Sequence, residues 1–419
     1  MQNYRIKFAF KHVNSPVACC ALSTKVGTRN ENPEYNGLAH FNEHMLFKGT
    51  EKRGSVSINN VLENVGGELN AYTTKEETVI HATVLKEDLK KAINLLFELA
   101  FTSVYPQKEL VKEIEVVYEE IISYKDSPAE SIYDDFESLL YSGHPLSLQI
   151  LGQKKTLNKI TPAILKNYLS EFFIPENMAI TIVADYSELE VVKMINSALK
   201  HFKKECVCSD NLNADISENY NKVEFADKNL LFNSNKPFYI DRLKHNHQAH
   251  CIIGNRAYSF YDEKKRLALA MLTNILGGPA TNSRLNMVLR ERNALVYNVE
   301  AMYNCYLDSG VFAIYFGCDK SLVEKCLSLI YKELENVIEC ELTSRELFNA
   351  KKQLLGQLSI AADNSEAQCL SMGKSLMVFG YVEPLLKTRE KIESLTSKDL
   401  LNVAREIFVK DKLSVMIYK

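Results

Sequence analysis

An internal repeat limits the folds that this sequence can adopt. The segment that begins at Ile160, ITPAILKNYLSEFFIPENMAITIV, aligns without a gap with the segment that begins at Leu395, LTSKDLLNVAREIFVKDKLSVMIY, at a constant offset of 235 residues. Both segments are typical of a threonine-capped helix that leads into a strand. A repeat that ends each half of the chain predicts two domains of one fold, with a chance helix–strand similarity as the alternative.

The repeat divides the chain into a first domain at 1–205, a polar, Asn-rich linker at 206–235 and a second domain at 236–419. Strands alternate with amphipathic helices in both halves, which indicates α+β domains in which a mostly antiparallel sheet packs against helices. In the first half we predict strands at 16–26, 67–73 and 78–85, the last two as a hairpin, and helices at 36–48, 54–65, 86–102 and 107–124.

Charge and composition exclude several classes of partner. The chain has 50 basic and 53 acidic residues, so no excess of one sign attracts it to nucleic acid or to a membrane surface. The N-terminus alternates polar and apolar residues, unlike a secretory signal, and no run of about 18 apolar residues predicts a membrane span. The ten cysteines are scattered, and the Cys206-x-Cys208 pair has no second pair nearby, so we expect reduced thiols in a cytoplasmic protein.

One short segment carries a metal-binding pattern. The sequence from His40 to His44 reads H-x-x-E-H, with Glu43 between the two histidines. Residues four apart on a helix lie on one face, so both imidazoles can reach the same ion. A chance occurrence is the alternative explanation for so short a motif. Two imidazoles leave zinc in need of a third protein ligand, with the fourth position kept for water in a catalytic site.

A downstream helix offers the missing carboxylate. In KELVKEIEVVYEEIISYKDSP, the residues Glu113, Val116, Val117 and Glu120 follow the i, i+3, i+4, i+7 pattern of one helix face. Glu119 is rotated away by about 100° and is expected to face solvent. We therefore predict Glu120 as the third ligand and Glu113, two turns earlier, as a group that orients a histidine or the substrate, with a surface carboxylate as the alternative for Glu113.

These motifs together resemble a known family. HFNEHMLFKGT, the segment from Asn70 to Thr73, the glutamates at 113 and 120, HPLSLQILG at 144–152 and NSRLNMVLRERNALVY at 282–297 are similar to the inverted zinc-binding peptidases of the pitrilysin type. The family includes insulin-degrading enzyme and the mitochondrial processing peptidase. The resemblance implies that His40, His44 and Glu120 bind one Zn²⁺ per chain, that Glu43 is the catalytic base and that Glu113 supports the site.

The resemblance also assigns substrate contacts. It implies that Arg290 and Tyr297 contact the substrate, with an exposed helix arginine and a packed tyrosine as the alternative. It also implies that Asn70 and Ala71 belong to an edge strand to which a peptide adds, with a turn asparagine as the alternative for Asn70. Several positions depart from the family pattern: Asn42, His81 and Asn293-Ala294. None of these removes a catalytic atom, and His81 is either a satisfied core histidine or a group near the metal.

The predicted function is that of a zinc-dependent endopeptidase acting on peptides or unfolded segments, in which Glu43 removes a proton from water and passes it to the leaving amine. The length matches one half of the longer family members. The resemblance therefore implies a homodimer that closes as a two-fold clamshell around the substrate. A non-catalytic or heteromeric assembly subunit and a zinc hydrolase of another amide bond are the alternatives.

Overall fold

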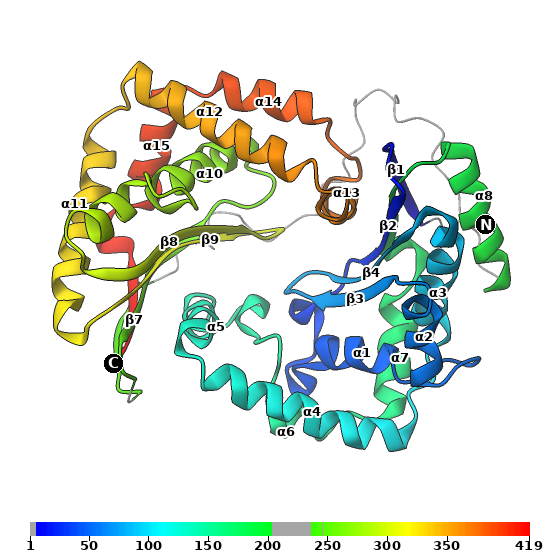
Figure 1. Ribbon diagram of the computed structural model, residues 1–419. Helices are drawn as coiled ribbons and strands as arrows, with labels where there is room; N and C mark the ends of the chain where they lie inside the picture. The colour runs from blue at the N-terminus through cyan, green and yellow to red at the C-terminus, as the bar shows by residue number, and fades with distance from the viewer. Residues whose placement is uncertain (1–5, 203–235, 245) are drawn as a thin grey trace. The chain divides into compact units, whose positions relative to one another are not determined.

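A computed structural model describes residues 6–202, 236–244 and 246–419 of the protein (Figure 1). The predicted linker at 206–235 lies outside the described residues. Within the described ranges the chain forms two compact units, the first from 6–122, 144–202 and 360–383 and the second from 123–143, 236–359 and 384–419. No helix in the described ranges is long and apolar enough to cross a membrane.

The first unit is built on a five-stranded sheet in the order β1-β5-β2-β4-β3. β1 and β5 are parallel and the other pairs are antiparallel. The strands are β1 (Lys7–His12), β2 (Val17–Thr24), β3 (Glu68–Thr73), β4 (Thr78–Leu85) and β5 (Met178–Ala184). The predicted hairpin is confirmed, because β3 pairs with β4 in a register that places Thr73 opposite Thr78. β3 is an edge strand.

Helices from the first half of the chain cover one face of this sheet. They are α1 (Leu38–Leu46), α2 (Ser55–Glu63), α3 (Leu89–Thr102), α4 (Gln107–Lys125), α6 (Lys154–Leu157), α7 (Pro162–Phe172) and α8 (Glu188–His201). Apolar side chains of α1, α3 and α7 form one core with the inward residues of β2, β4 and β5. The four predicted helices are therefore confirmed, and their ends agree to within three residues.

The second unit repeats this plan. Its five strands are ordered β6-β10-β7-β9-β8, again with one parallel pair, β6 with β10. The strands are β6 (Tyr239–Arg242), β7 (Ala249–Ala257), β8 (Val296–Cys305), β9 (Gly310–Cys318) and β10 (Ser414–Tyr418). The helices are α10 (Glu263–Gly277), a π-helical turn (Asn286–Glu291), α11 (Val323–Glu339), α12 (Ser344–Ala361), α14 (Leu385–Ser394) and α15 (Ser397–Ile407).

The internal repeat supplies the same element to both sheets. Thr161 caps α7 by accepting a hydrogen bond from the backbone N–H of Ile164, and Thr396 caps α15 in the same way with Asp399. Each helix leads into the strand that lies second in its sheet, β5 or β10. The predicted α+β fold of two related domains is confirmed.

Each unit takes one helix from the other half of the chain. Helix α13 (Ser365–Phe379) packs on β2 and β5 in the first unit, on the face of the sheet opposite the other helices, where Cys369 and Met372 meet Ala21 and Val183. Helix α5 (Pro128–Leu140) packs on β7 and β10 in the second unit. The compact units therefore do not follow the order of the chain, although the repeat does.

Candidate metal centre

Helix α1 presents the two histidines of the H-x-x-E-H motif on one face. Apolar residues Leu38, Phe41 and Met45 occupy a different face and pack into the core of the first unit, which fixes the rotation of the helix. The imidazole rings of His40 and His44 lie one turn apart, with their centroids separated by 4.6 Å. His40 is buried, whereas His44 is partly accessible.

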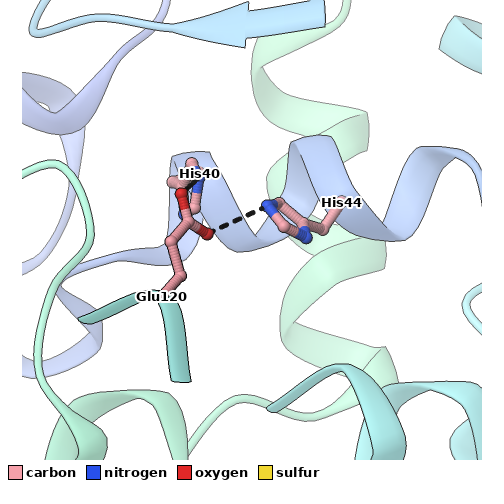
Figure 2. A group of neighbouring side chains, drawn as sticks. All are labelled: His40, His44 and Glu120. Carbon is pink, nitrogen blue, oxygen red and sulfur yellow. Dashed lines mark ion pairs between the residues drawn. The ribbon is translucent and has the colours of Figure 1, made fainter. Parts of the chain in front are cut away.

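Helix α4 brings Glu120 to the two imidazoles, as Figure 2 shows. One carboxylate oxygen lies 3.7 Å from His40 Nε2 and the other lies 3.5 Å from His44 Nε2. Leu110, Glu113 and Val117 lie on the buried face of α4. Glu120 lies at the edge of this face, and its side chain is 45 % exposed. Within the described residues, these three form the one group of three or more His, Cys, Asp or Glu side chains that can hold a metal ion. We call His40, His44 and Glu120 the candidate metal centre.

The donor atoms of this centre suit zinc. One donor atom from each residue lies within 4.8 Å of the others. Ligand atoms about 2 Å from a tetrahedral zinc ion are themselves roughly 3.3 Å apart, close to the 3.7 and 3.5 Å that separate Glu120 from the two imidazoles. Burial, with the neighbouring His44, lowers the pKa of His40 to about 3, so this imidazole keeps a lone pair for a metal. Two imidazoles and one carboxylate leave a fourth position for water, as in catalytic zinc sites.

Glu113 contacts His44 on Nδ1, the ring nitrogen that does not face Glu120. Its carboxylate lies 2.9 Å from His44 Nδ1 and 2.7 Å from Lys48 Nζ. Burial acts to raise the pKa of Glu113, but hydrogen bonds from His44 and Lys48 outweigh it and lower the pKa, so the group is ionised. An ionised acceptor at Nδ1 favours a proton on that nitrogen and leaves Nε2 directed toward Glu120.

Glu43 is positioned beside the centre without belonging to the donor group. Thr73, the last residue of β3, donates a hydrogen bond of 2.5 Å from its hydroxyl to Glu43 Oε2. Burial raises the pKa of Glu43, and the hydrogen bond from Thr73 and the proximity of His44 partly counteract that shift. A carboxyl group with a raised pKa accepts a proton more readily near neutral pH, which is the property required of a general base.

The predicted peptide-binding residues lie on the edge strand of the first sheet. Asn70 is exposed on β3 and pairs in register with His81 of β4, and Ala71 pairs with Ile80. β3 leads directly to Thr73 and thus to Glu43. A peptide added to this strand would lie beside Glu43.

Arg290 and Tyr297 belong to the second unit. Arg290 lies in the π-helical turn, 53 % exposed, with Glu291 at 3.9 Å as its charged neighbour. Tyr297 lies at the start of β8 and is 83 % exposed. Both side chains are therefore accessible, and their role in substrate contact stays a prediction.

The positions that depart from the family pattern have structural partners. His81 faces α13, where its Nδ1 lies 3.0 Å from the Glu366 carboxylate, and it is not part of the candidate metal centre. Burial lowers the pKa of His81 despite Glu366. Asn42 is fully buried and accepts a hydrogen bond of 2.7 Å from the hydroxyl of Tyr105.

Sequence reasoning missed two side chains that contact the site, Thr73 and Lys48. Both occur in the segments that define the pattern, NAYT and HMLFKGT, but neither carries a signal of its own. Their contacts depend on the approach of β3 and α4 to α1, which spacing along the chain does not predict.

Comparisons with known proteins agree with this geometry. Residues 7–154 match the model of the Insulinase (Peptidase family M16) domain, and residues 159–354 match that of the Peptidase M16 inactive domain. An uncharacterized zinc protease of Rickettsia felis is 31 % identical over 94 % of this chain and 91 % of its own length. The uncharacterized zinc protease YmxG of Bacillus subtilis is 29 % identical over 96 % of this chain and 94 % of its own length.

A solved structure supports the fold. The crystal structure of a protease from Helicobacter pylori superposes with a TM-score of 0.85 at 21 % identity, covering 98 % of this chain and 96 % of the other. The resemblance predicted from the sequence motifs is thus confirmed over nearly the whole chain. The protein belongs to peptidase family M16, the insulinase family of zinc proteases.

Proposed function

We propose that the chain is a zinc-dependent endopeptidase that cleaves peptides or unfolded segments. The observation that carries this proposal is the convergence of His40, His44 and Glu120, with Glu43 and its partly buried hydrogen bond beside them. His40, His44 and Glu120 would hold a zinc ion, which would supply the Lewis acidity that polarises a peptide carbonyl and makes water more acidic. A purely structural subunit would not need this donor set.

Glu43 would perform the proton transfers. Its Oε2 is engaged by Thr73, which leaves Oε1 to accept a proton from the attacking water. The same carboxyl group would then donate that proton to the amine that leaves. Burial raises the pKa of Glu43 and so favours its protonated form between the two steps.

The remaining residues would bind and orient. Glu113 and Lys48 fix the imidazole of His44. The free edge of β3 at Asn70 and Ala71 would take the peptide as an added strand through main-chain hydrogen bonds. Arg290 and Tyr297 would donate hydrogen bonds to the substrate carbonyl, because a guanidinium and a phenol are both suited to an oxygen on which negative charge develops.

The direct test of this function is peptide cleavage by protein loaded with one equivalent of zinc. A mixed peptide library is incubated with the protein, with and without a chelator, and the products are identified by mass spectrometry. We expect internal cleavages that the chelator abolishes and that zinc restores. A folded, zinc-loaded protein that leaves the library intact would contradict the proposal.

We further propose that two copies close around the substrate, in the cytoplasm, and that each zinc site is completed by Arg290 and Tyr297 of the other copy. The accessibility of both side chains supports this arrangement. Inactive Glu43→Gln protein is mixed with inactive Arg290→Ala protein under conditions of subunit exchange. Shared sites predict that activity reappears, because a mixed dimer has one intact site. Continued inactivity with demonstrated exchange would exclude shared sites.

A further inference from the structure

The helix that carries both histidines begins without a cap of its own. Gly37 precedes α1 in the left-handed region, at φ +96°, and has no side chain to accept hydrogen bonds from the first turn. The first N–H groups of any helix need such acceptors. Glu31 supplies them from six residues upstream: one oxygen accepts from the N–H of Gly37 at 2.8 Å and the other from that of Ala39 at 2.7 Å.

A buried glutamate is an unfavourable helix cap, because burial removes its carboxylate from water. The side chain of Glu31 is almost completely buried, and this burial raises its pKa to about 7, although the N–H of Ala39, the amide of Asn36 and the N–H of Gly37 lower it. An ordinary Ser, Thr or Asp at the N-cap would satisfy the same N–H groups with less desolvation. The cost of burying Glu31 therefore indicates that this carboxylate does more than cap the helix, and the contacts of its loop indicate that it fixes the position of the first turn.

The loop that carries Glu31 is fixed to the segment at 149–156. The side-chain amide of Asn36 donates to Glu31 Oε2 and to the carbonyl of Gln149, both at 2.9 Å. The hydroxyl of Thr156 donates to the carbonyl of Asn36 at 2.6 Å. Gly152 lies so close that a Cβ there would be 2.3 Å from the same carbonyl. The carboxylate is thus held on a rigid support.

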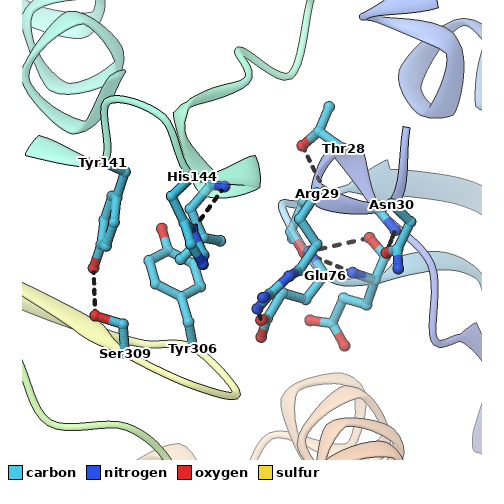
Figure 3. A network of polar contacts seen from close by, with 12 residues as sticks. Thr28, Arg29, Asn30, Glu76, Tyr141, His144, Tyr306 and Ser309 are labelled. Atoms are coloured by element: carbon cyan, nitrogen blue, oxygen red, sulfur yellow. Dashed lines mark hydrogen bonds and ion pairs between the residues drawn. The ribbon is translucent and has the colours of Figure 1, made fainter. Parts of the chain in front are cut away.

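The other end of the loop is fixed to the turn that follows β3. The N–H of Thr28 donates to the carbonyl of Thr74, and the N–H of Arg29 donates to that of Lys75. The Arg29 side chain forms an ion pair with Glu76, as Figure 3 shows. This turn begins one residue after Thr73, the partner of Glu43. The loop therefore connects the start of α1 to the strand that orients the base.

The two histidines differ in what holds their rings. The Nδ1 of His44 is bound by Glu113, whereas the Nδ1 of His40 is buried and has no hydrogen-bond partner among the described residues. With no partner on its Nδ1, His40 depends on the backbone of the first turn for its place, and Ala39 is the residue before it. We propose that Glu31 is a positioning residue that fixes this turn and so places His40 for the metal.

The inference rests on the proposed zinc site, and its test measures metal affinity instead of peptide cleavage. The change is Glu31→Gln, which keeps the size of the side chain but replaces one acceptor oxygen with an NH₂ that faces N–H donors. We expect the Kd for zinc, measured by competition with a chromogenic chelator, to rise about 10- to 100-fold, as for other groups that orient metal ligands. The visible spectrum of the Co²⁺-substituted protein should change as well, because the ligand geometry changes.

Two controls separate positioning from general effects. Glu34→Gln removes the same charge from the same loop, but Glu34 is exposed and pairs with Lys159 at 2.9 Å, so its zinc affinity should match that of the wild type. Ile195→Ala removes a buried side chain of α8 and lowers stability without touching the loop, so its zinc affinity and Co²⁺ spectrum should be unchanged at a temperature where it is folded.

Four outcomes are decisive. Wild-type zinc affinity in folded Glu31→Gln overturns the inference, as does an equal loss in Ile195→Ala. If Glu31→Gln does not fold, Asn36→Ala replaces it. That variant removes one of the three donors to the carboxylate and should weaken zinc binding less but in the same direction, and wild-type affinity in it would overturn the inference. A protein that binds zinc in this Glu31-dependent way but cleaves no peptide would refute the proposed function and leave the inference standing.

Discussion

Replacing Glu113 with glutamine tests how the candidate metal centre is built. The change keeps an oxygen that can accept from His44 Nδ1, but it removes the negative charge that faces both His44 at 2.9 Å and Lys48 at 2.7 Å. A hydrogen bond to an ionised acceptor is roughly twice as strong as one to a neutral acceptor. Loss of such a group behind a ligating histidine typically weakens metal binding about 10- to 100-fold, or about 1.4–2.7 kcal/mol.

The assay measures the Kd for zinc at about pH 7.5 by competition with a chelator, for Glu113→Gln and for the matched control Glu115→Gln. Glu115 is exposed on the same helix, so the control loses the same charge without a contact to the histidine. We expect the larger Kd only for Glu113→Gln. Equal affinities in the two variants would show that the contact between Glu113 and His44 does not orient the ligand.

Two further predictions concern protons and packing. Although burial opposes the shift, the hydrogen bond that His44 donates to Glu113 raises the pKa of His44, whereas the pKa of His40 is about 3, so zinc should displace one proton. The Kd for zinc, measured as a function of pH, should then rise about tenfold for each pH unit below the pKa of His44. A hundredfold rise per unit would mean that two protons are displaced and would contradict this prediction. Gly152→Ala should be less stable than Gly143→Ala by about 1–3 kcal/mol in urea unfolding, because both have positive φ but only Gly152 faces a carbonyl oxygen at 2.3 Å. Equal stabilities would show that this approach is not tight.

Local structure in the first half follows closely from the sequence pattern. The hairpin at 67–73 and 78–85 and the helices of the metal site depend on periodicity and short-range turns, and these are the signals that a sequence carries directly. The repeat at Thr161 and Thr396 predicts two similar sheets, because a shared cap, helix and strand make sense only in a shared fold.

Contacts between distant elements are harder to predict from the sequence. The pattern on α4 predicts Val116 on the buried face, but this side chain is 52 % exposed, and Glu120 lies at the rim of the helix instead of facing inward. The apolar face of α13 contains no information about which sheet it covers, so its place in the first unit could not be predicted. Glu31 is similar, because its role depends on backbone N–H groups of another segment, which have no sequence signature.

The candidate site residues also differ in how far the sequence alone predicts them. Helical spacing alone predicts His40, His44 and Glu120 as a group, and the structure brings them together. Arg290 and Tyr297 are predicted only through the family resemblance, because an exposed arginine and an exposed tyrosine are common on any surface.

The turnover of Glu43→Gln at full zinc occupancy tests whether Glu43 is the base and not a ligand of the metal centre. The variant and the wild type are loaded with zinc, the metal content is confirmed, and cleavage of an internally quenched peptide is followed under single-turnover conditions. We expect one zinc per chain in both proteins and a rate reduced by about 10²–10⁴ in the variant. A variant that retains zinc and cleaves at the wild-type rate would contradict the account, as would one that loses its zinc.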